Sequence, residues 1–121
     1  MQSKTPEAPK EKQNVTELVE KDYETEVLKA SLPVVVDFYS VESAPCTALA
    51  PRYVAVADKF EGKIRFVKIS RQANPGLAEK LKVTTSPTLV FFKGGKECGE
   101  RLFGDDIKRT ALKAQVEALL K

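Results

Sequence analysis

Apolar residues follow two different periods along the chain, and the changes between them predict the order of the elements. Short, nearly continuous apolar runs at 34–39, 64–69 and 89–92 predict strands, and a shorter one fits 15–19. Helical spacing predicts helices over about 22–30, 46–60, 74–82 and 105–120. A diglycine at 94–95 predicts a tight hairpin turn into a last strand at about 96–103.

A single α/β domain accounts for this alternation of strands and helices. The strands at 34–39 and 64–69 flank one helix, which predicts a βαβ unit with a right-handed crossover. The chain has 121 residues, 42% of them hydrophobic, which is enough for one core and too little for a second domain. Residues 1–14 are polar, contain Pro6 and Pro9 and show no apolar period, so we expect a disordered extension before a domain at 15–121.

Asp37 is the anomaly of the strand at 34–39, because it places a carboxyl group inside an apolar run. A buried carboxylate must be paired, hydrogen-bonded or kept protonated by a raised pKa. Asp37 is therefore either a tolerated structural defect or a group that handles protons, and the residue alone leaves both interpretations open.

Cys46 stands where this strand gives way to a helix. Ser43 is suited to the N-cap and Pro45 to the first turn of that helix. A thiol at this place lies near the positive end of the helix dipole, which favours the thiolate. Against this, a lone cysteine is more often a small buried hydrophobic residue than a nucleophile.

Charge and composition narrow the chemistry. The 20 basic residues exceed the 17 acidic ones only slightly and are dispersed, so we expect neither a nucleic-acid nor a membrane partner. Histidine is absent, which removes Ser-His-Asp and Cys-His catalysis and histidine-ligated zinc sites. Cys46 and Cys98 lie far apart in unlike contexts, so no CxxC pair and no metal cluster can be written, and we expect no cofactor.

Targeting signals do not stand out either. No apolar segment has the length of a membrane span, and the N-terminus lacks the pattern of a secretory signal. We therefore expect a soluble, cytoplasmic protein.

The stretch VVVDFYSVESAPC at 34–46 resembles the active-site stretch of thioredoxins, typically VLVDFWAxWCGPC. The match continues through LAP at 49–51, NPxLA at 74–78, SPT at 86–88 and the diglycine hairpin, in the same order. The resemblance covers roughly residues 15 to 120. It implies the thioredoxin fold, in which helices flank both faces of a mixed central β-sheet.

The resemblance also implies roles at the turn. In thioredoxins the first cysteine of CGPC attacks a substrate disulfide, and the second resolves the mixed disulfide. In the alignment Ser43 takes the nucleophile position and Cys46 the resolving position, with Ala44 and Pro45 between them. Asp37 matches the buried acid that relays a proton.

A second set of residues matches the substrate-binding side of that family. Ser86, Pro87 and Thr88 match the loop with a cis-proline, which faces the active site and offers its backbone to the substrate chain. The resemblance therefore implies a cis bond between Ser86 and Pro87. Glu42, which replaces the usual tryptophan, and Ala44 complete the predicted contact surface.

Three functions fit these residues. The first is a protein-disulfide oxidoreductase of cell redox homeostasis whose attacking sulfur has been replaced, by evolution or by substitution, so that the chain with Ser43 is inactive. Its partners would be disulfide-containing proteins and a thioredoxin reductase for the parent enzyme, and we expect a monomer. The second is a binding module that keeps the surface beside Pro87 without redox turnover, which Glu42 favours.

The third function is a single-thiol protein that acts through mixed disulfides of Cys46, although the resolving position is normally shielded. Cys98 follows the hairpin turn, at the end of the resembling sheet away from Cys46. We therefore read it as a core residue beyond disulfide reach.

Overall fold

The computed structural model describes residues 14–104 and 107–121. The strands are β1 (Val15–Leu18), β2 (Val34–Tyr39), β3 (Arg65–Ser70), β4 (Thr88–Lys93), β5 (Lys96–Glu97) and β6 (Leu102–Phe103). The helices are the 3₁₀ turn η3 (Glu20–Asp22), the π-helical turn η4 (Glu24–Leu28), α1 (Ala44–Lys59), α2 (Pro75–Lys80) and α3 (Arg109–Ala118). None of these helices is long and apolar enough to cross a membrane.

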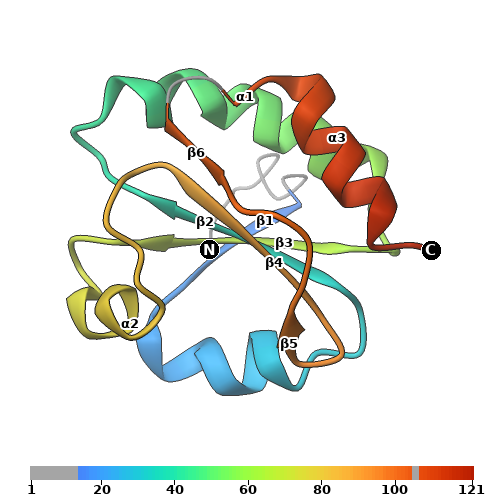
Figure 1. Cartoon of the computed structure of the whole chain (residues 1–121), viewed down its shortest axis with the longest axis horizontal. Coiled ribbons are helices and arrows are strands. Elements are labelled where there is room, and N and C mark those ends of the chain that lie inside the picture. Colours follow the sequence, from blue (N-terminus) through green and yellow to red (C-terminus); the bar gives the residue numbers. More distant parts are fainter. Residues whose placement is uncertain (1–13, 105–106) are drawn as a thin grey trace, which may run out of the picture.

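One mixed sheet organises the domain. Its strands lie in the order β1-β3-β2-β4-β5, and β6 also pairs with β4. β1 and β2 both run parallel to β3, whereas β4 is antiparallel to β2. α1 and α3 cover one face of the sheet, and η4 and α2 cover the other (Figure 1). The fold predicted from the sequence is confirmed.

The alternation of side chains along β2 separates the core into two clusters. Val34, Val36 and Phe38 join the cluster on the side of η4 and α2. Val35 joins the cluster under α1 and α3. Asp37 has the same parity as Val35, so its side chain lies on the α1 side of the sheet. Its partner in the parallel register with β3 is Lys68.

The start of α1 agrees with the sequence. Ser43 is the N-cap, its Oγ accepts a hydrogen bond from the Cys46 amide at 3.3 Å, and Pro45 lies in the first turn. Pro51 lies inside the helix, as predicted. The helix begins at Ala44, two residues before the expected Cys46, because the cap residue is followed directly by the first turn.

The segment before β2 differs from the single helix that the spacing predicts. It forms η3 followed by η4, which buries Val27 as expected. Asp22, the predicted N-cap, instead lies inside η3, and its carboxylate accepts a hydrogen bond from the Val19 amide at 3.3 Å. Asp22 therefore bonds back to the residue that precedes η3, and it is not the N-cap of a following helix.

The predicted strand at 96–103 is also wrong as one element. Gly94 and Gly95 both have positive φ, as a two-residue hairpin turn requires, and a Cβ on Gly95 would lie 2.7 Å from the Leu28 carbonyl oxygen. β4 first pairs Phe92 with Glu97 and then Leu89 with Leu102. The returning chain therefore carries extra residues that leave the ladder, and it divides into β5 and β6.

The structure also revises the expected start of the last helix and the expected extent of the N-terminal extension. α3 begins at Arg109 after the N-cap Lys108, later than the predicted start near 105. Asp105 and Asp106, the expected acidic first turn, lie outside the described residues, as do residues 1–13 of the predicted extension. Asn14, assigned to that extension, donates a hydrogen bond from its side-chain amide to Asp58 Oδ1 at 2.8 Å.

Candidate functional site

The start of α1 meets the loop that precedes β4. Ser43 Oγ donates a hydrogen bond to the Ser86 carbonyl oxygen at 3.3 Å. Ser86 is joined to Pro87 by a cis peptide bond, the isomer that the sequence resemblance implies. Two segments 43 residues apart in the sequence are therefore in contact at Ser43.

Cys46 lies behind this contact, in the first turn of α1. Its side chain is buried, with 7% of the residue exposed, and its Sγ accepts a hydrogen bond from the Ser40 amide at 3.3 Å. Cys46 and Cys98 are both free thiols, and Cys98 is partly buried against the cluster under α1 and α3. Cys98 is thus a packing residue at the edge of the core, less buried than the sequence suggests.

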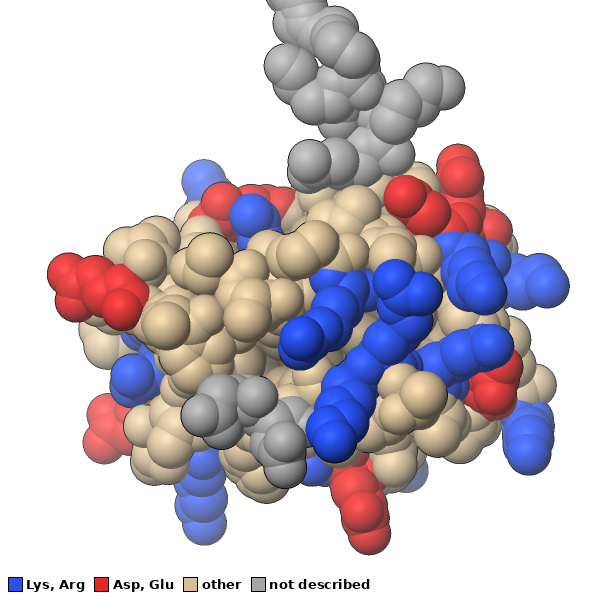
Figure 2. Space-filling model, turned by 90° about the horizontal axis from the view of Figure 1, so that it is seen from above, with Lys and Arg blue, Asp and Glu red and all other residues tan. Residues whose placement is uncertain are grey.

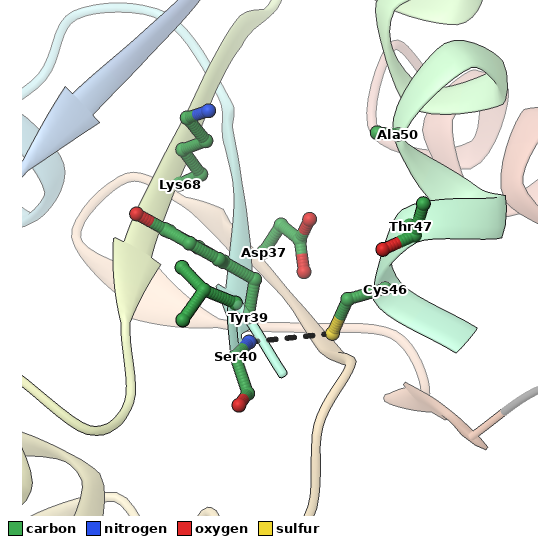
Figure 3. A pocket seen from close by; sticks show the side chains of 8 residues that line it. Asp37, Tyr39, Ser40, Cys46, Thr47, Ala50 and Lys68 are labelled. Atoms are coloured by element: carbon green, nitrogen blue, oxygen red, sulfur yellow. Dashed lines mark hydrogen bonds between the residues drawn. The ribbon is translucent and has the colours of Figure 1, made fainter. Parts of the chain in front are cut away.

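Asp37 faces a cavity of about 300 Å³ between the ends of β2 and β3 and the start of α1. Figure 3 shows its carboxyl group between Lys68 and Cys46, on the side toward the helix. Asp37 is 5% exposed, and its Oδ1 has no hydrogen-bond partner among the described residues. Loss of hydration raises the pKa of this carboxyl to about 7, against a smaller lowering effect of the Lys68 charge.

Tyr39 and Lys68 form the outer side of this cavity. The Lys68 ammonium lies 5.3 Å from the centre of the Tyr39 ring, a cation–π arrangement. The Tyr39 hydroxyl donates a hydrogen bond to Glu17 of β1. Burial, the hydrogen bond to Glu17 and its charge raise the pKa of Tyr39 to about 12, so this phenol keeps its proton.

The predicted substrate-contact residues differ in accessibility. Glu42 and Ala44 are exposed, Ser86 is partly buried, and Pro87 is buried. Thr88 is fully buried, and its hydroxyl donates to the Thr85 carbonyl oxygen at 2.9 Å. The Thr88 side chain therefore supports the loop from inside and does not face a bound chain.

Sequence reasoning missed Arg71 and Phe103 beside this site. The Arg71 Nε donates to Ser86 Oγ at 2.7 Å, which places a cation on the loop that contacts Ser43. Phe103 is 57% exposed and pairs with Thr88, and the next residue, Gly104, donates its amide to the Pro87 carbonyl oxygen at 3.0 Å. The signal that could have found Arg71 was its position just after a predicted strand, whereas Phe103 lay within the predicted strand at 96–103 and gave no separate signal.

The site offers a capping hydroxyl, a buried thiol, a buried carboxyl and a proline loop. Within the described residues, no group of three or more His, Cys, Asp or Glu side chains is arranged to hold a metal ion. The arrangement fits chemistry in which a buried carboxyl exchanges a proton with a neighbouring thiol.

Comparison with known proteins decides the family. The sequence model of thioredoxin matches residues 14–118, most of the chain. This chain belongs to the thioredoxin family. It is 36% identical to thioredoxin 1 of Nostoc over 81 residues, which are 67% of this chain and 76% of that protein. It is also 36% identical to a thioredoxin of Synechocystis over 74 residues (61% and 69%) and to one of Rickettsia bellii over 84 residues (69% and 77%).

Proposed function

We propose that this thioredoxin-family protein is a protein-disulfide oxidoreductase scaffold in which Ser43 occupies the position of the attacking thiol. The observation that carries the proposal is the placement of Ser43 Oγ at the start of α1, 3.3 Å from the carbonyl oxygen before the cis-proline. Cys46, three residues later, and Asp37 both line the cavity behind it. The chain with Ser43 is expected not to catalyse disulfide exchange.

Oxygen at position 43 blocks the first step. Disulfide exchange begins when a thiolate attacks one sulfur of the substrate disulfide and the other sulfur leaves as a thiolate. An alcohol forms no such mixed disulfide, and its pKa lies far above the value of about 8.5 for a thiol. Ser43 Oγ accepts a hydrogen bond from the Cys46 amide, and Arg71 places a positive charge on the neighbouring loop. Neither interaction makes up the difference in pKa between an alcohol and a thiol.

With sulfur at position 43, the remaining groups would complete the cycle. The mixed disulfide would form at position 43, and the Cys46 thiol would give its proton to the Asp37 carboxylate and attack that sulfur. A disulfide between positions 43 and 46 would form, and the second substrate sulfur would leave reduced. Two electrons thus pass to the substrate, and an external dithiol returns them to the protein.

The partners of such a protein would be disulfide-containing proteins and, for a form with cysteine at position 43, a thioredoxin reductase. We propose a monomer that works in the cytoplasm. Ser86, Pro87, Glu42 and Ala44 are the proposed contacts to a bound substrate segment.

The test is the reduction of insulin by dithiothreitol, followed by turbidity, with the chain as it is and with Ser43→Cys. We expect no acceleration with Ser43 and clear acceleration with Ser43→Cys. Ser43→Ala is the matched control for the cap, since it removes the hydroxyl without adding sulfur. Activity of the Ser43 form equal to that of an active thioredoxin would refute the placement of Ser43.

A second candidate function, a binding module without turnover, is favoured by exposed apolar side chains around the site. Val41 is 73% exposed beside the cavity, and Phe103 is 57% exposed beside Pro87. If Ser43→Cys stays inactive while the chain binds extended peptides, and Phe103→Ser weakens that binding, the binding module becomes the better account.

A further inference from the structure

A second cavity, of about 310 Å³, lies between α1 and α3. Ala55 and Val56 of α1 line it together with Lys59, and α3 contributes Arg109, Thr110 and Lys113. The helices are fixed here by apolar contacts beneath, since Val56, Leu112 and Val116 belong to one buried cluster. We call this cavity with its six lining residues the α1–α3 pocket.

Three cations converge on the α1–α3 pocket. Arg109 and Lys113 are four residues apart, so they share one side of α3, and Lys59 faces them from the end of α1. Seen from the side of these two helices, Lys and Arg side chains gather in the middle of the face (Figure 2). The whole chain carries a formal charge of only +3, so this gathering is local.

Carboxylates do little to neutralise these cations within the described part of the chain. Lys113 approaches Glu117 only at 3.9 Å, with both side chains largely exposed, so the pair is weak. Lys59 and Arg109 form no ion pair with the described carboxylates, in contrast to Arg65 and Arg101, which pair with Glu26 and Glu97. Among the described residues, the charged side chains that line the pocket are therefore all positive.

The start of α3 also favours anions. Lys108 at the N-cap supplies no capping oxygen, and the first turn contains no acidic residue. The first amides of a helix lack intrahelical partners and attract anions. The Thr110 hydroxyl offers a further donor on the same turn.

We propose that the α1–α3 pocket binds a small molecule that carries a phosphate group. Convergent cations and a hydroxyl suit the several oxygens and the double charge of a phosphate monoester. The volume lies at the small end of the range for small-molecule sites, and Ala55 and Val56 give its floor an apolar part. An extended acidic peptide segment, by contrast, would need a row of cations along the surface, whereas these three line one cavity.

This site is independent of the proposed disulfide chemistry. Ser43 caps the first turn of α1 and Lys59 ends its last, so the 16-residue helix separates the two places by on the order of 20 Å. Binding at the pocket is therefore expected with Ser43 or with Ser43→Cys, and it does not depend on the outcome of the insulin assay.

The test is an NMR titration of the isotope-labelled full chain with inorganic phosphate, at an ionic strength held constant with chloride. We expect saturable amide shifts confined to the end of α1 and the start of α3. Lys59→Gln/Lys113→Gln should weaken the fitted affinity about tenfold. The charge-matched control Lys21→Gln/Lys80→Gln, on exposed residues of η3 and α2, should leave it unchanged.

Three outcomes would overturn the proposal. The first is shifts that rise linearly and spread over the surface lysines, and the second is an equal loss of affinity in both double variants. The third is a glutamate-rich peptide that shifts the same amides at lower concentration than phosphate, which would make the ligand an acidic protein segment.

Discussion

Two polar side chains, Tyr53 of α1 and Asp37 of β2, are buried between α1 and the sheet, and their surroundings differ. The Tyr53 hydroxyl shares its single proton between the carbonyl oxygens of Val35 at 2.9 Å and Val67 at 2.7 Å, and its ring lies edge-on to Phe66. Asp37 follows Val35 by two residues on β2, yet its Oδ1 has no partner among the described residues. Both side chains are at most 5% exposed.

The two groups differ in their hydrogen bonds and in where burial places their pKa values. Burial raises the pKa of Tyr53 well above 10, so this hydroxyl stays protonated and anchors α1 to two strands. Burial raises the pKa of Asp37 to about 7, where a carboxyl both gives and takes protons. A polar group buried with its partners strengthens the core, whereas one buried without them costs stability.

The largest effect on stability is expected for Asp37→Asn. Above pH 4 the unfolded carboxyl ionises while the folded one keeps its proton up to about pH 7, so the folded state binds more protons and stability falls as pH rises. At about pH 8 the variant should exceed the parent in free energy of unfolding by on the order of 4 kcal/mol, with little gain at about pH 4.

Urea unfolding at both pH values measures this difference. An equal pH dependence of the two proteins would mean that Asp37 has an ordinary pKa, and the contrast with Tyr53 would be lost.

Tyr53→Phe should have a smaller effect of opposite sign. The change removes only the hydroxyl that bonds Val35 and Val67, which should lower the free energy of unfolding by about 1–3 kcal/mol at either pH. Tyr23→Phe is the matched control, because Tyr23 is also buried but its hydroxyl makes no hydrogen bond within the described residues. Equal losses in the two variants would contradict the anchoring role of Tyr53.

The smallest expected difference concerns thiol access at the two free cysteines. In the folded protein Cys46 should be alkylated several-fold more slowly than the partly buried Cys98, and the two rates should converge after unfolding. Mass spectrometry after timed labelling measures both sites in one sample. Rapid native labelling of Cys46 would instead support the single-thiol function.

Local patterns explain which parts of the fold could be predicted. The apolar run of β2, the cap at Ser43 and the diglycine turn each act over a few residues, and the structure confirms all three. The return of the chain after β5 was missed because residues 98–101 read as a continuing strand. Residues 99–101 leave the ladder because pairing with β4 resumes only at Leu102, and Gly99 has φ of +72°, whereas the Cys98 amide still donates to the Phe91 carbonyl oxygen.

The candidate site was predictable in its residues more than in its contacts. Asp37 stood out as a charge in an apolar strand, and the structure adds that its carboxyl is buried and that its Oδ1 has no hydrogen-bond partner among the described residues. Ser86 makes hydrogen bonds with Ser43, 43 residues away in the sequence, and with Arg71, 15 residues away. No local sequence pattern predicts either contact. The same holds for the α1–α3 pocket, which exists only once two helices pack.

The most direct test of the contrast between Asp37 and Tyr53 is an NMR titration of the Asp37 side-chain carboxyl in the folded chain. The account predicts an apparent pKa of about 7. It also predicts a further rise in Lys68→Gln, because the Lys68 charge lowers the pKa. A midpoint near the ordinary value of 3.8, unchanged by Lys68→Gln, would contradict the account, since Asp37 would then be a solvated carboxylate unable to take a proton from Cys46.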